Sequence, residues 1–428
     1  MAHDFHRVTL AAPLVNLFAV TSVVVPLGFL TLGSELLFPA LGKILARPLA
    51  WLTWLLLHVV QWFAHFPHWS YRIPGPPAWL VVTLFTVAVL LTAVIRLQSS
   101  WQRRASRGLC AGWLSCSVLV ALFPFPAKWS AGKLEVTILD MGQGDSIFVV
   151  SPRGRTLLID GGGAFAGFAG QEEHGGSDPG EEAVSPYLWS RGYQKLDVVA
   201  LTHAHLDHIG GLTAILDNFR VGKLWIGREA VSPALARLEE LARSKNIPIE
   251  HETRGQSFAW DAVEGEFFWP AIPPTEVGPS AKNNDSLVLR LRYGNRAVLL
   301  PGDAEKEAER AILDQNKEAE LQADILKVGH HGSKNSTIPA FLAAVRPQTA
   351  IISAGEENPY GHPSPELIER LEEAGIRILR TDRDGAVHVL TDGQRVDIAC
   401  FVACPEPAAS EALRQAQAPD HQKHTEQQ

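Results

Sequence analysis

The chain has 428 residues, 46% of them hydrophobic and 20% charged, with a formal net charge of −8 at pH 7. This length is sufficient for one globular domain of ordinary size and a second region beside it. The negative charge excludes a broadly basic surface for nucleic acid. Any such contact must therefore be local, for example through Lys327 and Lys334.

Four apolar runs within residues 1–131 predict helices that span a membrane. The runs are residues 10–38, 49–66, 78–95 and 109–127. Each is close to the roughly 17–25 residues that cross a bilayer as a helix, and tryptophans cluster near their ends, as at a membrane interface. The alternative is a buried helical domain of a soluble protein. The second run, which contains Pro48 and Gln61, would also suit a helix lying along the interface.

The placement of arginines predicts how these helices are oriented. The segment between the third and fourth runs contains four arginines and no acidic residue, whereas the segment between the second and third contains one arginine. Positively charged loops remain on the cytoplasmic side. We therefore expect a multi-pass region in the plasma membrane over residues 1–131 and an extracytoplasmic domain over residues 132–404.

The extracytoplasmic part alternates strands and helices. The expected strands are residues 134–140, 146–151, 155–160, 263–269, 286–293 and 296–301, and the expected helices are residues 181–191, 209–219, 233–245, 304–315 and 365–374. The last two strands should form a hairpin around Gly294-Asn295. This alternation favours an α/β fold with two sheets between layers of helices. Residues 161–180 predict a Gly-rich surface loop, and residues 405–428 a disordered tail.

Residues 203–208 read His-Ala-His-Leu-Asp-His and follow a short apolar segment that predicts a buried strand. Three imidazoles and a carboxylate within six positions suit a metal far better than a core. On such a loop His203 and His205 point one way, and Asp207 and His208 can turn another, which gives two metals separate ligands. A His-rich polar turn is the alternative, but the strand, the cluster, Gly-Gly and a helix follow one another here.

Two further strand ends carry ligand-type side chains. Residues 298–303 lead into Asp303, which could bridge two cations, and residues 324–331 deliver His330 and His331. A sheet holds strand-end ligands rigidly, and neutral imidazole with carboxylate suits zinc and its first-row neighbours. We favour His330 as the ligand that closes the second site because it comes first, although the sequence leaves the pair unresolved.

The pattern His203-x-His205-x-Asp207-His208, followed by Gly-Asp303 and a later histidine, resembles the metallo-β-lactamase-fold hydrolases. Five further segments are similar to the C-terminal domain of ComEC, the membrane protein of bacterial DNA uptake in natural transformation. They are residues 140–145, 158–162, 283–286, 326–333 and 360–363. The resemblance implies an αββα sandwich preceded by the last transmembrane helices of a longer protein, whose N-terminal segments this chain would lack.

The resemblance also implies an activity, which is metal-dependent hydrolysis of phosphodiester bonds in the DNA strand that is not imported. Two cations about 3.5–4 Å apart lower the pKa of a bridging water and hold the phosphate in line. The residues expected in catalysis are Asp145, Asp207, Lys327 and His331, and those expected to contact substrate are Asn284, Ser286, Ser333 and His362. The expected partners are DNA, the lipid bilayer and other competence proteins.

Several of these roles have structural alternatives. Asp145 could serve only a turn, Lys327 could form a salt bridge at the sheet rim, and His362 could cap a helix. Asp160 is expected to hold the histidine loop by hydrogen bonds rather than to bind metal. Alanine in place of Lys327 is expected to leave the fold intact.

One departure from the superfamily pattern concerns the first metal. Many members place a third histidine between the first cluster and Gly-Asp, where this chain has Asn283-Asn284-Asp285-Ser286. An amide oxygen is a weaker ligand than imidazole, so that either Zn²⁺ or Mn²⁺ is expected. The same departure favours the alternative of a DNA-binding or transport module without catalysis.

The cysteines leave one further question open. Cys400 and Cys404 could pair in an oxidising compartment. Their spacing of four in a strand-like tail favours free thiols instead.

Overall fold

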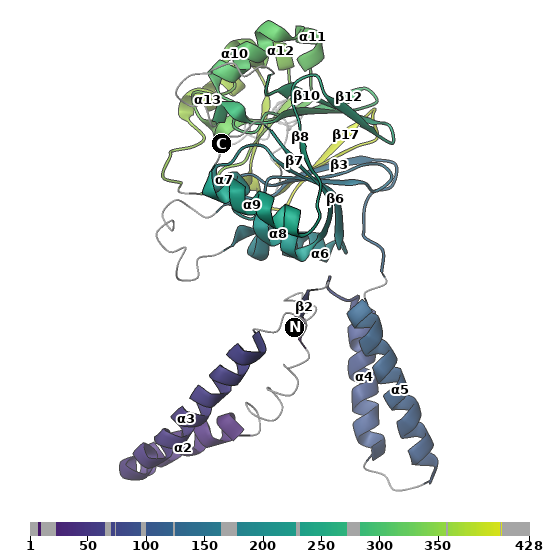
Figure 1. Ribbon diagram of the computed structural model, residues 1–428, viewed down its shortest axis with the longest axis vertical. Coiled ribbons are helices and arrows are strands. Elements are labelled where there is room, and N and C mark those ends of the chain that lie inside the picture. The colour runs from purple at the N-terminus through teal and green to yellow at the C-terminus, as the bar shows by residue number, and fades with distance from the viewer. Residues whose placement is uncertain are drawn as a thin grey trace, which may run out of the picture. The chain divides into compact units, whose positions relative to one another are not determined.

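The computed structural model describes residues 7–9, 23–64, 70–72, 74–95, 100–122, 125–163, 178–227, 232–271, 283–356, 358–402 and 404 (Figure 1). The chain forms two compact units. The first comprises Met1–Ala127 and Leu188–Tyr193, and the second comprises Lys128–Tyr187 and Gln194–Gln428. Most of the loop predicted over residues 161–180 and the whole tail predicted over residues 405–428 lie outside the described residues.

The first unit is mostly helical. Its elements are β1 (Arg7–Thr9), α2 (Val25–Leu37), α3 (Pro39–Ala64), β2 (Ser70–Arg72), α4 (Ala78–Ile95) and α5 (Ser100–Leu122). The strands β1 and β2 pair antiparallel. Many large apolar side chains of these helices are exposed, which is typical of surfaces that lipid or another protein covers.

The number of membrane spans differs from the prediction. Among the described residues, one helix, Pro39–Trp62, is long and apolar enough to cross a membrane, and Val25–Leu37 and Ala78–Val94 are shorter apolar helices. The four predicted spans are therefore not confirmed, and part of the first run lies outside the described residues. The helix that corresponds to the fourth predicted run, α5, begins at Ser100. It therefore includes three arginines that the prediction placed in a loop.

The second unit contains two mixed sheets. The first has the order β17-β16-β3-β4-β5-β6-β7-β8. Its strands are β3 (Leu134–Ile138), β4 (Ile147–Val150), β5 (Thr156–Ile159), β6 (Lys195–Leu201), β7 (Arg220–Ile226), β8 (Ile249–His251), β16 (Val387–Thr391) and β17 (Val396–Cys400). The four strands from β5 to β8 run parallel, so their carboxyl ends share one edge.

The second sheet has the order β15-β14-β13-β12-β11-β10-β9. Its strands are β9 (Ser257–Trp260), β10 (Val263–Trp269), β11 (Val288–Tyr293), β12 (Arg296–Leu300), β13 (Ile325–Lys327), β14 (Thr349–Ile352) and β15 (Arg377–Arg380). The predicted hairpin is present, because β11 and β12 pair antiparallel with Tyr293 opposite Arg296. The strands from β12 to β15 run parallel.

Helices cover the outer faces of both sheets. Figure 1 shows α10 to α13 beside the sheet that contains β10 and β12, and α7 to α9 beside the sheet that contains β6 and β7. The α-helices after residue 180 are α6 (Ser185–Ser190), α7 (Leu206–Ile209), α8 (Leu212–Asn218), α9 (Pro233–Ser244), α10 (Lys306–Gln315), α11 (Glu318–Leu321), α12 (Pro339–Val345), α13 (Pro365–Glu373) and α14 (Thr381–Asp384). Short turns of other helix types are η4 (Gly180–Val184), η5 (Asn283–Asp285) and η6 (Gly329–Gly332). The predicted αββα sandwich is confirmed.

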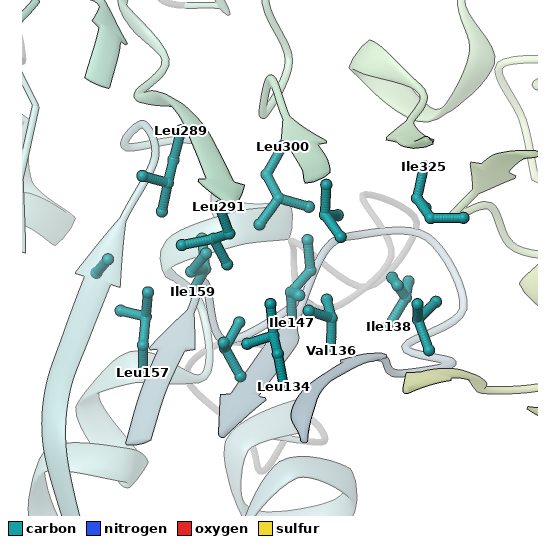
Figure 2. Packing of buried hydrophobic residues seen from close by; sticks show 14 of the residues in the cluster. Leu134, Val136, Ile138, Ile147, Leu157, Ile159, Leu289, Leu291, Leu300 and Ile325 are labelled. Atoms are coloured by element: carbon teal, nitrogen blue, oxygen red, sulfur yellow. The ribbon is translucent and has the colours of Figure 1, made fainter. Parts of the chain in front are cut away.

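The core between the sheets follows from the two-residue period of a strand. Leu134, Val136 and Ile138 of β3 point inward and meet residues of the second sheet such as Leu291 and Leu300 (Figure 2). A second cluster lies between the second sheet and its helices. Because both faces of the central strands are buried, these strands are almost wholly apolar until they end, and polar side chains begin there.

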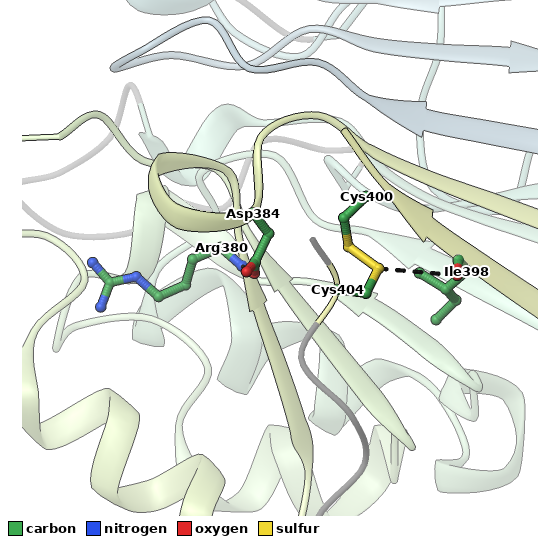
Figure 3. Close-up of a disulfide and its surroundings, with 5 residues drawn as sticks. All are labelled: Arg380, Asp384, Ile398, Cys400 and Cys404. Carbon is green, nitrogen blue, oxygen red and sulfur yellow. Dashed lines mark hydrogen bonds between the residues drawn. A yellow bond between two sulfur atoms is a disulfide. The ribbon is translucent and has the colours of Figure 1, made fainter. Parts of the chain in front are cut away.

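Cys400 and Cys404 form a disulfide (Figure 3). The prediction of free thiols was therefore wrong. The strand β17 ends at Cys400 and the chain bends immediately afterwards, which brings the two Cα atoms to 5.0 Å, a distance at which cysteines can be bridged. A continued strand would have separated them.

Candidate metal centre

The predicted ligands come together where parallel strands of both sheets end. Asp160 follows β5, His203 follows β6, Asp303 follows β12 and His331 follows β13. His203 and His205 precede α7, whereas Asp207 and His208 lie within its single turn. The rings of His203 and His208 nevertheless lie close together, with centroids 4.1 Å apart.

Four side chains form the centre of this group. One ligand atom from each of Asp207, His208, Asp303 and His331 lies within 4.8 Å of the others. The Nε2 atom of His331 is 3.3 Å from Asp207 Oδ2 and 3.6 Å from Asp303 Oδ2. The Nε2 atom of His208 is 3.2 Å from Asp303 Oδ2. Two imidazoles and two carboxylates at such distances match the donor set that zinc and its neighbours prefer.

Several atoms in this group are buried and have no hydrogen-bond partner among the described residues. They are His208 Nε2, His331 Nε2 and Asp303 Oδ1. Buried polar groups are normally satisfied, because an unpaired one loses its interaction with water. The two imidazole nitrogens, which face Asp207 and Asp303 Oδ2, therefore fit a bound divalent cation, whereas Asp303 Oδ1 faces the ammonium of Lys327.

The other ring nitrogen of each central imidazole is held in place. His331 Nδ1 donates to the carbonyl oxygen of Ser353 at 3.0 Å, and His208 Nδ1 donates to Asp160 Oδ2 at 2.8 Å. Asp160 also accepts hydrogen bonds from the backbone nitrogen and the hydroxyl of Thr202, at 2.7 and 2.6 Å. Such contacts orient the ring and leave Nε2 for a metal. The contacts expected of Asp160 are thus present.

His203 and His205 lie beside the central group. His203 Nε2 is 3.1 Å from His205 Nδ1 and 3.8 Å from Asp303 Oδ2. The hydroxyl of Ser286 lies 3.3 Å from His203 Nδ1 and accepts a hydrogen bond from the backbone nitrogen of Asp303 at 3.1 Å. Ser286 therefore links two predicted ligands from within the protein, whereas the sequence predicted that it contacts substrate.

Burial and neighbouring charges shift the pKa values of the ligand side chains, and the direction differs from one residue to the next. Burial lowers the pKa of His203, and the charge of His208 lowers it further. For His208, burial acts in the same direction, but the carboxylates of Asp303 and Asp160 outweigh it and raise its pKa well above the ordinary value. Burial alone would raise the pKa of Asp303, yet the adjacent histidines hold it well below its usual range. Without a metal, these shifts favour the neutral form of His203 and the positively charged form of His208.

His330 and His331 point in different directions. Both have left-handed backbone angles, with φ of 47° and 52°, a conformation that is uncommon for residues other than glycine. His330 Nδ1 donates to Glu305 Oε1 at 2.7 Å, and its Nε2 remains 4.0 Å from Asp303 Oδ2. The structure therefore brings His331, rather than the favoured His330, into the central group. The left-handed turn is the physical reason, and the sequence carries no signal for it apart from the following Gly332.

The two neighbouring asparagines have separate environments. The Oδ1 atom of Asn284 accepts hydrogen bonds from the backbone nitrogens of Glu305 and Ala308, at 3.0 and 3.3 Å, so it caps the start of α10. Asn283 lies nearer the ligands, with Nδ2 at 3.5 Å from His330 Nε2. Its Oδ1 atom is buried and lacks a hydrogen bond to any described residue. Sequence reasoning selected Asn284 and missed Asn283, because a doublet of identical residues does not show which one faces the site.

Lys327 is completely buried, whereas the prediction placed it where it could reach a phosphate or a salt bridge at the rim. Its ammonium donates to Asp145 Oδ2 and to the carbonyl oxygen of Gly302, and it lies 3.7 Å from Asp303 Oδ1. Burial lowers the pKa of Lys327, but Asp145 and Asp303 outweigh this effect and raise it. Alanine here would leave a cavity and unpaired carboxylates, so we now expect Lys327→Ala to destabilise the fold.

Asp145 belongs to a loop that closes on the histidine cluster. Its backbone nitrogen donates to the carbonyl oxygen of Asp207 at 3.1 Å. At the preceding Gly144, φ is 134° and a Cβ atom would lie 2.5 Å from that same oxygen. Only glycine permits this approach, which explains the Gly-Gln-Gly sequence before Asp145.

The remaining predicted residues lie nearer the edge of the group. The ring centroid of His362 is 5.6 Å from that of His330. Burial, and then the charges of His330 and His331, lower the pKa of His362 to about 4. The hydroxyl of Ser333 accepts a hydrogen bond from the backbone nitrogen of Asn335 at 3.3 Å, which stabilises the turn after the histidines.

Two residues that contact the histidines were not predicted from the sequence, Glu305 and Ser353. Ser353 acts through its backbone carbonyl, which any residue would supply, so its side chain gives no signal in the sequence.

Comparisons with known proteins agree with this arrangement. The family model described as Metallo-beta-lactamase superfamily matches residues 139–356, and the one described as Competence protein matches residues 1–98. ComE operon protein 3 of Bacillus subtilis is 37% identical over 315 residues, which are 73% of this chain and 39% of that protein. Competence protein ComA of Neisseria gonorrhoeae is 31% identical over 252 residues, which are 59% of this chain and 31% of that protein.

Among solved structures, the metallo-beta-lactamase fold protein YhfI from Bacillus subtilis is 14% identical, with a TM-score of 0.36. The match covers 58% of this chain and 95% of that chain. The chain spans less than half the length of the two curated relatives it matches above.

Proposed function

The chain belongs to the metallo-beta-lactamase superfamily, and on this basis we propose that it hydrolyses phosphodiester bonds of DNA with the help of divalent metals. The observation that carries this proposal is the group of Asp207, His208, Asp303 and His331, with its buried unpartnered atoms. The resemblance to the ComEC family is confirmed by the competence family match and the two relatives, which supports a role in DNA uptake.

We assign two metal positions. His203 and His205 would hold the first, Asp207, His208 and His331 the second, and Asp303 would be shared. Zn²⁺ or Mn²⁺ suits these donors. When bound, such ions supply a Lewis acid that activates water at neutral pH and neutralises phosphate charge.

The surrounding residues hold this group in position. Asp160 and Ser353 orient the two central imidazoles, and Ser286 connects His203 to the backbone of Asp303. Lys327 compensates the negative charge of Asp145 and Asp303. With Lys327 enclosed in this way, we assign it a positioning role rather than direct contact with phosphate.

We propose that the apolar helices of the first unit are embedded in the membrane and that the sandwich lies on its extracytoplasmic side. The Cys400–Cys404 disulfide supports this location, because disulfides persist in oxidising compartments. DNA and further competence proteins are the proposed partners. A reporter active only in the cytoplasm, fused after Gly132, should give no signal, and a strong signal would contradict the orientation.

The test of activity compares the full chain, purified in detergent, with its Asp207→Ala variant. Wild-type protein loaded with Mn²⁺ or Zn²⁺ should cleave a labelled single-stranded oligonucleotide, and Asp207→Ala should lose cleavage and bound metal. Asp314→Ala is the matched control, since Asp314 is an exposed carboxylate on α10. An inactive wild type that still binds DNA would favour the second candidate.

That second candidate is a DNA-binding module without catalysis. One observation favours it. Asn283, in the segment between the first cluster and Asp303 where many superfamily members have a third histidine, lies beside His330 with its Oδ1 atom buried and without a hydrogen bond to a described residue. Metal content separates the two candidates further, because a catalytic centre of the proposed kind needs two metal equivalents per chain.

A further inference from the structure

One exposed aromatic side chain borders the metal centre and has no role in the preceding description. Tyr360 is 54% exposed, although tyrosine is otherwise a residue that proteins tend to cover. Its ring stacks on that of His362, with centroids 6.0 Å apart and planes inclined by 21°. The second face of the phenol ring is thus available to a flat ligand.

The loop that carries Tyr360 is held rigidly by Asn358. The Oδ1 atom of Asn358 accepts hydrogen bonds from the backbone nitrogens of Tyr360 and His362, at 3.2 and 3.0 Å. Its Nδ2 atom donates to the carbonyl oxygens of His362 and Gly355, at 2.5 and 2.8 Å. Tyr360 is therefore positioned before a ligand arrives, which reduces the entropy lost on binding.

A chain of rings leads from Tyr360 to the metal ligands. The ring of His362 is 5.6 Å from that of His330, which is 6.2 Å from that of His331. Two rings, those of His362 and His330, thus lie between Tyr360 and His331 of the central group. A single strand that is bound at the centre and extends along this row of rings would place one of its bases at Tyr360.

We propose that Tyr360 stacks on an unpaired base of the strand bound at the metal centre, and that it makes the site selective for single strands. This inference rests on the proposed function, because it takes DNA as the ligand. Stacking on an aromatic ring is a general mode of single-strand binding, and it tolerates any sequence because every base has a flat face. In a duplex the bases are already stacked on each other and are not offered to Tyr360.

The test measures binding separately from cleavage. The full chain in detergent with Mn²⁺ is titrated into a short phosphorothioate-linked single strand, which resists hydrolysis, and anisotropy reports the affinity. Tyr360→Ala should weaken binding by about tenfold or more, whereas Tyr360→Trp should bind within about twofold of wild type. Phe401→Ala is the matched control, since Phe401 is an aromatic residue that is 86% exposed and follows β17.

Two further ligands make the result specific to stacking. Tyr360→Ala should not change the affinity for a blunt duplex or for a strand without bases. Equal weakening on the base-free strand, or unchanged binding of the normal strand by Tyr360→Ala, would overturn the inference. If wild type cleaves no DNA but single-strand binding still depends on Tyr360, the proposed hydrolysis fails and the stacking role stands.

Discussion

The two sides of the metal centre differ in how firmly their side chains are held. On one side, which we call the carboxylate half, Asp207, His208, Asp303 and His331 approach one another closely. Both of its imidazoles donate their other nitrogen to an oxygen within the protein. On the other side, the histidine half, His203 Nε2 lies 3.1 Å from His205 Nδ1, and its Nδ1 atom faces the hydroxyl of Ser286 at 3.3 Å. For the two metal positions proposed above, the difference predicts a preorganised position in the carboxylate half and a weaker one in the histidine half.

Protonation reinforces the difference. In the metal-free protein, burial and the charge of His208 keep the pKa of His203 low, so this imidazole is already in the form that binds metal. In the carboxylate half, burial is outweighed by Asp303 and Asp160, which raise the pKa of His208. A metal must therefore displace a proton from the better-supported half.

The largest effect is expected from Asp303→Ala, because Asp303 is the ligand that we propose the two halves share. Both metal positions would lose a ligand, and cleavage of single-stranded DNA should fall by about 10³-fold or more. Metal analysis of the purified chain should show less than one equivalent. Asp314→Ala is the control on the surface of α10. Two retained equivalents in Asp303→Ala would show that the halves are independent.

Asp160→Asn tests the support of the carboxylate half alone. The substitution keeps the size of the side chain but removes the charge that holds His208. Metal affinity should fall by about 10–100-fold, as is typical when a residue behind a ligand is changed. Competition with a chromogenic chelator measures it. Unchanged affinity for the tighter equivalent would mean that this half does not depend on Asp160.

Asn283→His tests whether the histidine half is weak because it lacks an imidazole. The new ring should supply the missing donor, so a second zinc equivalent should survive chelator concentrations that remove it from wild type. Asn283→Ala is the matched variant and should lose the second equivalent more readily than wild type. Equal retention in all three proteins would mean that Asn283 does not face this metal.

The smallest effect concerns the stability of the metal-free protein as a function of pH. Because the pKa of His208 is raised by folding, its contribution to stability is complete below the unfolded value near 6.5 and is lost as pH rises through the folded value. The melting temperature should therefore fall as the pH rises above 6.5. Asp160→Asn should flatten this dependence, and scanning fluorimetry at several pH values measures both proteins. An equally steep decline in the variant would contradict the assignment.

Much of the site could be predicted because its signals are local. In three places the sequence has metal-ligand residue types directly after an apolar segment. They are the cluster from His203 to His208, Asp303, and the doublet His330-His331. The strands themselves follow from short apolar runs bounded by turns, and the β11–β12 hairpin from Gly294-Asn295. These features depend on neighbouring residues only, so the sequence contains the whole of their cause.

The remaining features depend on contacts between distant segments. Lys327 is adjacent in space to Asp145, 182 positions away, and that contact turns an apparent surface cation into a buried structural one. The choice of His331 over His330 depends on two left-handed residues that only the packed turn after β13 stabilises. The bounds of the apolar helices likewise differ from the predicted runs, as α3 and α5 show.

The sequence by itself thus determined the ligand types, the strand ends that carry them and the superfamily. Tertiary structure decided which ligand atoms converge, which of two adjacent histidines or asparagines faces the centre, and that Cys400 and Cys404 are joined. The physical reason is that residue type and spacing set the local backbone, whereas the direction of a side chain at a strand end is set by burial and by hydrogen bonds to residues far away in the chain.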